Sequence, residues 1–404
     1  DGSSGSIRSH CSSVNWRNLD VVRAIRSRSR SLPLTYGRHA LVEQVRHRLE
    51  AAQSLVTAEE IEELRVCLAV VASGHATVVQ LGDCAEPFVE LSPQAVDRKL
   101  DFIDEAADLV AGATGQGVIA IGRVAGQFAK PRSNPTETVA GQDIPTYMGD
   151  AVNGPGPTPE EREPDPFRLL RGHRLAQRAT EAIRHHNSTT GRKIWTSHEA
   201  LLMDYEHPQV RFQGHDRYLT STHWPWIGNR TRQLDGAHLS LMEVIRNPVS
   251  CKIGPGVSTS EAERLVRTLN PHNEKGRLSL IARFGRSRIR DDFPAIVSAL
   301  CTAGLEFNWM VDPLHGNTRS ADDGAKTRLI PDVLDEVTAF NEILKTFDLH
   351  SAGIHLEATG DYGIEECTTS VDSRRGPNSY RSLCDPRLNR IQTAEVLTAW
   401  TEGR

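Results

Sequence analysis

The stretch ATVVQLGDCAEPF, from Ala76 to Phe88, shows the pattern on which the fold prediction depends. A short apolar run ends at a glycine, and two reactive side chains, Asp83 and Cys84, follow it directly. Such a run is typical of a buried parallel strand when an amphipathic, helix-forming stretch comes next. Similar runs begin at Gly117, Lys193, Tyr218, Ser250, Leu278, Glu306 and Ala352.

Eight runs of this kind are the number that a closed parallel barrel requires, so we predict a (β/α)8 TIM barrel, of class α/β, over residues 74–404. An open, doubly wound sheet is the alternative, but it does not explain reactive residues at the end of nearly every strand. Apolar positions three and four residues apart predict an N-terminal helical extension over residues 14–73. Residues 1–13 are expected to be flexible, and the segment from Lys130 to Arg192 to be a loop region with one helix near 165–185, which could cover the active site.

The charge and cysteine content exclude several classes of protein. The chain has 404 residues and a formal net charge of −5, so it offers no broad positive surface to a nucleic acid or an anionic membrane. No apolar run approaches the ~20 residues that cross a bilayer, and the start lacks a signal-peptide pattern. The 7 cysteines are odd in number and widely spaced, which indicates reduced thiols. We expect a cytoplasmic protein that binds neither nucleic acid nor membrane.

Two sets of side chains stand at the ends of the predicted strands, where (β/α)8 enzymes have their active sites. A single arginine at such a position is most often an ordinary surface ion pair. Several cations at one rim of an acidic chain instead predict a pocket for phosphates and carboxylates. The cationic set comprises Arg123, Lys130, Arg132, Arg230, Lys252 and Arg283.

The second set mixes one soft donor, one borderline donor and two hard donors, a combination that suits Mn²⁺, Fe²⁺, Co²⁺ or Zn²⁺. Its members are Cys84, His315, Glu357 and Asp385. They lie too far apart in the sequence for their spacing to be informative. Taken alone, Cys84 is more often a buried core thiol and His315 a loop histidine. The barrel prediction brings them to one rim.

Eight strings occur together in one order: LGDCAEPF (81–88), GRVAGQFAKPRS (122–133), GDAVNG (149–154), WTSHEALLMDYE (195–206), STHWPWIGNRTRQLDGAH (221–238), CKIGP (251–255), DPLHGNT (312–318) and CDPRLN (384–389). Over residues 75–390 the chain closely resembles the class II 3-deoxy-D-arabino-heptulosonate 7-phosphate (DAHP) synthases. The resemblance implies a metal-dependent condensation of phosphoenolpyruvate with erythrose 4-phosphate and water, which yields DAHP and phosphate. It also implies a homo-oligomer, a dimer or a tetramer.

The resemblance implies functional roles for the residues of this chain that match the family's motifs. It implies a divalent metal, with Mn²⁺ first and Co²⁺, Fe²⁺, Zn²⁺ or Cd²⁺ as alternatives, bound by Cys84, His315, Glu357 and Asp385. Cys84 and His315 are therefore expected to take part in catalysis as ligands of that metal. Lys130 is expected both to bind charge and to donate a proton to the new alkoxide, a role that a bound water could take instead. Phosphoenolpyruvate is expected at Arg123, Lys130, Arg230, Lys252 and Arg283. The aldose phosphate is expected at Arg132, Ser133, Lys326 and Arg328.

The chain departs from the family in two places. Asn229 stands in the substrate site where the family has glutamate before the matching arginine, which leaves the exact aldose open. The stretch from Ser133 to Arg230 is short, so we expect the short form, which lacks the aromatic amino-acid regulatory insertion and often serves secondary metabolism. An amino-DAHP synthase that uses an imino sugar phosphate and a non-catalytic paralogue remain alternatives. We also expect Cys84 and Cys384 to lie at one rim, where oxidation could join them and eject the metal.

Overall fold

The computed structural model describes residues 39–132, 134–139, 141–322, 324–372, 376 and 378–404. Eight parallel strands within these residues form a closed barrel and lie around it in chain order. The strands are β1 (Ala76–Gly82), β2 (Gly117–Arg123), β5 (Ile194–Glu199), β8 (Trp224–Ile227), β9 (Val249–Ile253), β10 (Leu278–Ala282), β11 (Asn308–Val311) and β14 (Gly353–Glu357). Each predicted run contains one of them, which confirms the (β/α)8 fold.

Strand register brings functional side chains together at the carboxyl end of the barrel. Gly82, the last residue of β1, pairs with Arg123 on one side and with Glu357 on the other. A Cβ atom at position 82 would lie 2.7 Å from the carbonyl oxygen of Arg123, and the φ of Gly82 is +149°. A glycine is therefore required at position 82, where β1 and β2 approach each other.

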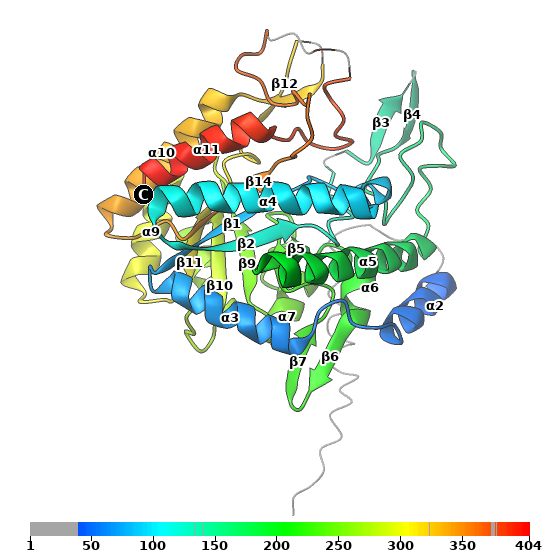
Figure 1. Cartoon of the computed structure of the whole chain (residues 1–404), viewed down its shortest axis with the longest axis horizontal. Helices are drawn as coiled ribbons and strands as arrows, with labels where there is room; N and C mark the ends of the chain where they lie inside the picture. The colour runs from blue at the N-terminus through cyan, green and yellow to red at the C-terminus, as the bar shows by residue number, and fades with distance from the viewer. Residues whose placement is uncertain (1–38, 133, 140, 323, 373–375, 377) are drawn as a thin grey trace, which may run out of the picture.

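Amphipathic helices surround the barrel and bury its outer face (Figure 1). Helix α4 shows how the sequence sets a helix: the Ser92 side chain caps its start, and Gly115 ends it in a left-handed conformation with φ +67°. The helices outside the strands are α4 (Pro93–Thr114), α5 (Phe167–Thr190), α7 (Ala237–Val244), α8 (Thr259–Leu269), α9 (Ile289–Thr302), α10 (Ile330–Thr346) and α11 (Arg390–Glu402). Short helical turns are η2 (Phe88–Leu91), α6 (Met203–Glu206) and η3 (His207–Gln209).

Two helices precede the barrel, α2 (His39–Glu50) and α3 (Ala58–Ala72). Leu64, Leu68 and Val71 of α3 are fully buried in a cluster with barrel residues that include Trp224 and Met310. Helix α3 thus packs on the barrel and buries part of its interior. The predicted helical extension has helices over 39–50 and 58–72, whereas its part from residue 14 to 38, and the predicted flexible residues 1–13, lie outside the described residues. The division into an extension and a catalytic domain stays a prediction.

The segment from Lys130 to Arg192 contains more structure than the sequence predicted. Besides α5 it holds an antiparallel hairpin of β3 (Thr136–Val139) and β4 (Gln142–Pro145). These strands are four residues long and largely exposed, so no apolar run marks them. Two further hairpins pair β6 (Val210–Gln213) with β7 (Asp216–Leu219), and β12 (Thr318–Ser320) with β13 (Lys326–Arg328).

The run that begins at Tyr218 was predicted as one strand, and this boundary was wrong. Tyr218 belongs to hairpin strand β7, and only Trp224–Ile227 enters the barrel as β8. Among the residues that the structure describes, no helix is both long enough and apolar enough to span a bilayer.

Candidate active site

The four predicted metal ligands surround the ammonium group of Lys130, which follows β2. The Nζ atom of Lys130 lies 2.6 Å from Glu357 Oε1, 2.7 Å from Cys84 Sγ, 2.8 Å from Asp385 Oδ2 and 3.2 Å from His315 Nε2. These residues come from four separate parts of the chain. The barrel therefore brings together side chains whose sequence spacing carried no information.

The donor atoms themselves are close enough to share one ion. The ligand atoms of Cys84, Glu357 and Asp385 lie within 4.8 Å of one another. The Nε2 atom of His315 lies 2.8 Å from Glu357 Oε1, so the imidazole reaches the same place. Cys84 follows β1, Glu357 ends β14, and Asp385 lies in the loop before α11. A thiol, an imidazole and two carboxylates suit a divalent transition metal.

Asp312 orients the imidazole of His315. Its Oδ2 atom lies 2.6 Å from His315 Nδ1 and 2.7 Å from Lys252 Nζ. Burial would raise the pKa of Asp312, but His315 and Lys252 hold it well below its usual range. Burial also lowers the pKa of His315, which keeps the ring neutral. The Asp312 carboxylate accepts the Nδ1–H bond and leaves the Nε2 lone pair directed at the donor cluster, as metal-binding histidines require.

Two arginines balance the charge of Glu357. Glu357 is fully buried, and its carboxylate contacts Arg123 Nη2 at 3.2 Å and Arg328 Nη2 at 2.7 Å. Burial alone would raise the pKa of Glu357, but His315, Lys130 and Arg328 keep it well below its usual range. Glu357 is therefore an anionic oxygen donor at neutral pH.

The pKa of Cys84 is shifted in the opposite direction to that of Glu357. Burial, the hydrogen bond with the Cys384 thiol and the charge of Glu357 together raise the pKa of Cys84 well above its usual range, although Lys130 opposes them. A bound divalent cation would supply the positive charge that the thiolate form needs.

Two of the predicted cations, those of Arg123 and Lys252, lie over the indole ring of Trp226. The guanidinium carbon of Arg123 lies 5.2 Å from the centroid of the Trp226 ring, and Lys252 Nζ lies 5.8 Å from it. Arg123 also places Nη1 2.8 Å from Nε2 of His355. Arg283, which follows β10, donates from Nη2 to the carbonyl oxygen of His315. The structure therefore brings Arg123, Lys252 and Arg283 to the donor cluster.

The other predicted substrate residues lie around this centre. Arg230 donates to the carbonyl oxygen of Pro131 at 3.1 Å, next to Lys130. Arg132 donates to Cys384 Sγ at 3.2 Å, and Lys326 Nζ lies 2.7 Å from Asp385 Oδ1. Arg328 is fully buried against Glu357.

Two predicted positions are not placed at the centre. The Oδ1 atom of Asn229 accepts a hydrogen bond from Arg232 Nε at 3.1 Å, so the amide that replaces the family's glutamate makes a local contact. Ser133 lies outside the described residues.

Glu199 lies at the same end of the barrel, and the sequence analysis gave it no role. It ends β5, and within the described part of the chain its buried Oε1 atom has no hydrogen-bond partner. Burial raises the pKa of Glu199, although Lys252, Lys130 and Arg123 oppose the increase. Its position at the carboxyl end of a barrel strand was the available signal.

The closed parallel barrel and the charged cluster at its carboxyl end define an enzyme of the (β/α)8 class. The model of the class-II DAHP synthetase family matches residues 21–192 and 184–399. The chain therefore belongs to the class-II DAHP synthetase family. This membership confirms the resemblance seen in the sequence and favours an enzyme over a non-catalytic paralogue.

Curated relatives agree with this membership. The chain is 43% identical over 362 residues to a Pseudomonas fluorescens protein named probable phospho-2-dehydro-3-deoxyheptonate aldolase, with 87% of this chain and 90% of the relative covered. It is 37% identical to the phospho-2-dehydro-3-deoxyheptonate aldolase of Streptomyces coelicolor, with 86% and 89% covered. This activity is that of DAHP synthase, so the chain is an enzyme of that type. A solved aldolase of the same name from Francisella tularensis shares the fold, with a TM-score of 0.52, 14% identity and 95% of both chains covered.

Proposed function

We propose that this enzyme condenses phosphoenolpyruvate with erythrose 4-phosphate at the rim around Lys130, and that a divalent metal bound by Cys84, His315, Glu357 and Asp385 is required. The observation that carries the proposal is the convergence of these four donors on one ammonium group. A lysine there neutralises the donors and can also hold a proton beside a reacting oxygen.

The donor set fits a divalent ion on chemical grounds. Glu357 and Asp385 offer anionic oxygens, because nearby cations hold the pKa of each below its usual range against the effect of burial. His315 offers a neutral nitrogen, and Cys84 a sulfur. Such a mixed set suits Mn²⁺, our first choice, and also Co²⁺, Fe²⁺, Zn²⁺ or Cd²⁺. When bound, the ion would polarise the aldehyde carbonyl as a Lewis acid.

The chain's own residues would then bind and orient both substrates. Arg123, Lys252, Arg283 and Arg230, together with Lys130, would hold the phosphate and carboxylate of phosphoenolpyruvate. In the reaction C3 of phosphoenolpyruvate forms a bond to the aldehyde carbon, and Lys130 gives a proton to the aldehyde oxygen. A water oxygen then adds at C2, and phosphate leaves. Glu199, whose carboxyl lies among the same cations, is our candidate to accept the proton of that water.

The aldose phosphate would lie on the outer side of the donor cluster. Lys326 is exposed and reaches Asp385, and Arg132 reaches the neighbouring Cys384, so both can meet an incoming phosphate. Ser133, Arg328 and Asn229 complete the proposed substrate residues. Asn229 contacts Arg232 and directly precedes Arg230 in the chain, which is why we include it.

The cellular setting is also a proposal. The six described cysteines are free thiols, and the chain carries a net charge of −5, both of which suit a soluble protein of the cytoplasm. We propose a homo-oligomer, a dimer or a tetramer, that serves secondary metabolism. Sedimentation of the purified protein at several concentrations tests the oligomeric state.

The proposed reaction is tested with the purified enzyme, phosphoenolpyruvate and Mn²⁺, with erythrose 4-phosphate or its imino analogue offered separately. Loss of phosphoenolpyruvate and the mass of the new sugar acid are followed together. We expect DAHP and one phosphate per phosphoenolpyruvate consumed. A preference for the imino analogue would identify an amino-DAHP synthase instead.

A further inference from the structure

A buried ion pair joins the loops that carry two of the proposed metal ligands. Asp83 precedes Cys84, and Arg387 follows Asp385 by two residues. Both are buried, with exposed fractions of 3%, and Asp83 Oδ1 lies 2.6 Å from Arg387 Nη1. The loops also meet at the donor atom itself, because the backbone N–H of Asp385 donates to Cys84 Sγ at 3.3 Å. The ion pair and this hydrogen bond therefore link the loops that carry the sulfur and the carboxylate.

A second carboxylate, that of Glu366, anchors the loop around Asp385 through several hydrogen bonds. Glu366 is fully buried. Its Oε1 atom accepts from the backbone N–H groups of Arg381 at 3.0 Å and Ser382 at 2.7 Å, and from Arg387 Nη2 at 2.9 Å. Its Oε2 atom accepts from the backbone N–H and Nε of Arg387, at 2.7 and 3.1 Å. Glu366 thus holds the loop on both sides of Asp385.

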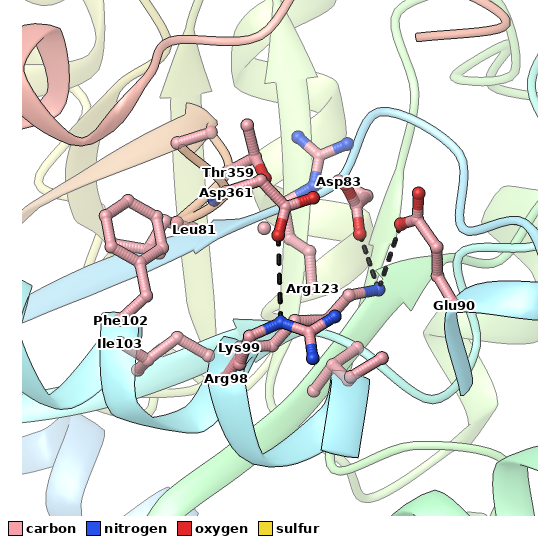
Figure 2. A pocket seen from close by; sticks show the side chains of 15 residues that line it. Leu81, Asp83, Glu90, Arg98, Lys99, Phe102, Ile103, Arg123, Thr359 and Asp361 are labelled. Atoms are coloured by element: carbon pink, nitrogen blue, oxygen red, sulfur yellow. Dashed lines mark hydrogen bonds and ion pairs between the residues drawn. The ribbon is translucent and has the colours of Figure 1, made fainter. Parts of the chain in front are cut away.

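Lys99 holds Asp83 from the other side. Its ammonium extends from α4 to Asp83 Oδ2 at 2.6 Å and faces Glu86 at 3.4 Å and Glu90 at 3.7 Å. Figure 2 shows Lys99 reaching Asp83 and Glu90 across a small cavity between α4, the end of β1 and the loop after β14. Burial would lower the pKa of Lys99, but these three carboxylates raise it above its usual range. Lys99 is therefore a fixed positive charge outside the donor cluster.

We propose that Lys99 and Asp83 are positioning residues of the metal centre. The buried chain Lys99, Asp83, Arg387 and Glu366 sets the distance between the loops that supply Cys84 and Asp385. The inference rests on the proposed function, since it assumes that these two side chains bind the metal. Residues that orient metal ligands in this way commonly change metal affinity by about 10- to 100-fold when mutated.

The chain offers a matched pair of variants for the test. Lys99→Met removes the charge but keeps most of the side-chain volume, so Asp83 keeps only Arg387 and is repelled by Glu86 and Glu90. Arg98→Met is the control, because Arg98 is on the same helix and lines the same cavity. Its side chain is 64% exposed, and its ion pair is with Asp361 at 3.9 Å.

Co²⁺ binding to metal-depleted full-length protein measures the effect without the reaction. Absorption reports both the affinity and the thiolate-to-cobalt charge-transfer band of Cys84. We expect Lys99→Met to raise the Kd for Co²⁺ by about 10- to 100-fold and to change the visible band, with Arg98→Met within about twofold of wild type. Thermal unfolding of each protein shows that it is folded. If Lys99→Met does not fold, Lys99→Gln, which keeps a hydrogen-bond donor for Asp83, replaces it.

The two possible failures are distinguishable. If wild-type protein binds Co²⁺ without a thiolate band, or does not bind it, the proposed metal centre itself is wrong. If wild type shows the band and the folded Lys99 variant matches it in affinity and spectrum, the metal centre stands and the positioning role is overturned.

Discussion

The Nζ atom of Lys130 lies 2.7 Å from the Sγ atom of Cys84, and the same ammonium contacts Glu357, Asp385 and His315. One ammonium group thus lies within 3.2 Å of a ligand atom of every proposed metal ligand. Its positive charge keeps donors together that would otherwise repel one another. A divalent ion would take over this neutralising role and leave Lys130 available as a proton donor.

Because Lys130 contacts the proposed metal ligands, we predict that Lys130→Met reduces turnover but does not weaken metal binding. Turnover should fall by at least about 100-fold, because a proton donor and a substrate-binding charge are lost. The Kd for Mn²⁺ should stay the same or decrease, because a competing cation is removed from the donors. Calorimetric titration with Mn²⁺ and a steady-state assay on the same preparation measure both values. Metal affinity weakened as strongly as turnover would contradict the assignment.

Cys84→Ser should weaken metal binding through loss of the sulfur donor. We expect roughly a 100-fold higher Kd, since one of only four protein donors changes from sulfur to a neutral oxygen. Cys251→Ser is the matched control, because Cys251 is also a fully buried cysteine but lies in the packed core of β9. Metal content after desalting is measured for both variants. Equal occupancy in the two would exclude Cys84 as a ligand.

The barrel could be predicted from the sequence because barrel strands such as β1 are buried on both faces and appear as apolar runs. The hairpins were not predicted, because strands such as Thr136–Val139 are short and largely exposed. For the site, strand ends indicated Arg123 and Glu357, but only the register shows that both pair with Gly82. The strand-end position of Glu199 was visible in the sequence, but its raised pKa depends on burial that only the folded barrel creates, so no role could be assigned to it from the sequence. Likewise, nothing in the spacing of Asp83 and Arg387 indicates that they meet.

Glu199→Gln should slow turnover by about 100- to 10,000-fold if its carboxylate accepts the proton of the attacking water. Burial raises the pKa of Glu199, so the wild-type carboxyl stays protonated to a higher pH than an ordinary glutamate. The basic form appears only as pH rises through that pKa, so wild-type kcat should increase with pH in this range. The glutamine variant should lack this increase. A variant within tenfold of wild type, with an unchanged pH profile, would exclude the role.

Oxidation should join Cys84 to Cys384, because the two thiols lie in one small buried cluster. With hydrogen peroxide the two thiols would lose two hydrogens, form one disulfide and yield two waters, and the sulfur donor would be lost to the metal. We expect a mass decrease of about 2 Da, release of metal and recovery with a thiol reductant. Cys384→Ser should retain its metal under the same mild treatment. Equal metal loss from this variant and from wild type would refute the coupling.

Metal reconstitution tests the central claim most directly. The enzyme is stripped with a chelator, desalted and titrated with Mn²⁺, while consumption of phosphoenolpyruvate in the presence of erythrose 4-phosphate is followed. Our account predicts no turnover in the stripped enzyme and recovery that saturates at one ion per chain, with recovery abolished in His315→Ala. Full activity of a verified metal-free preparation would contradict it.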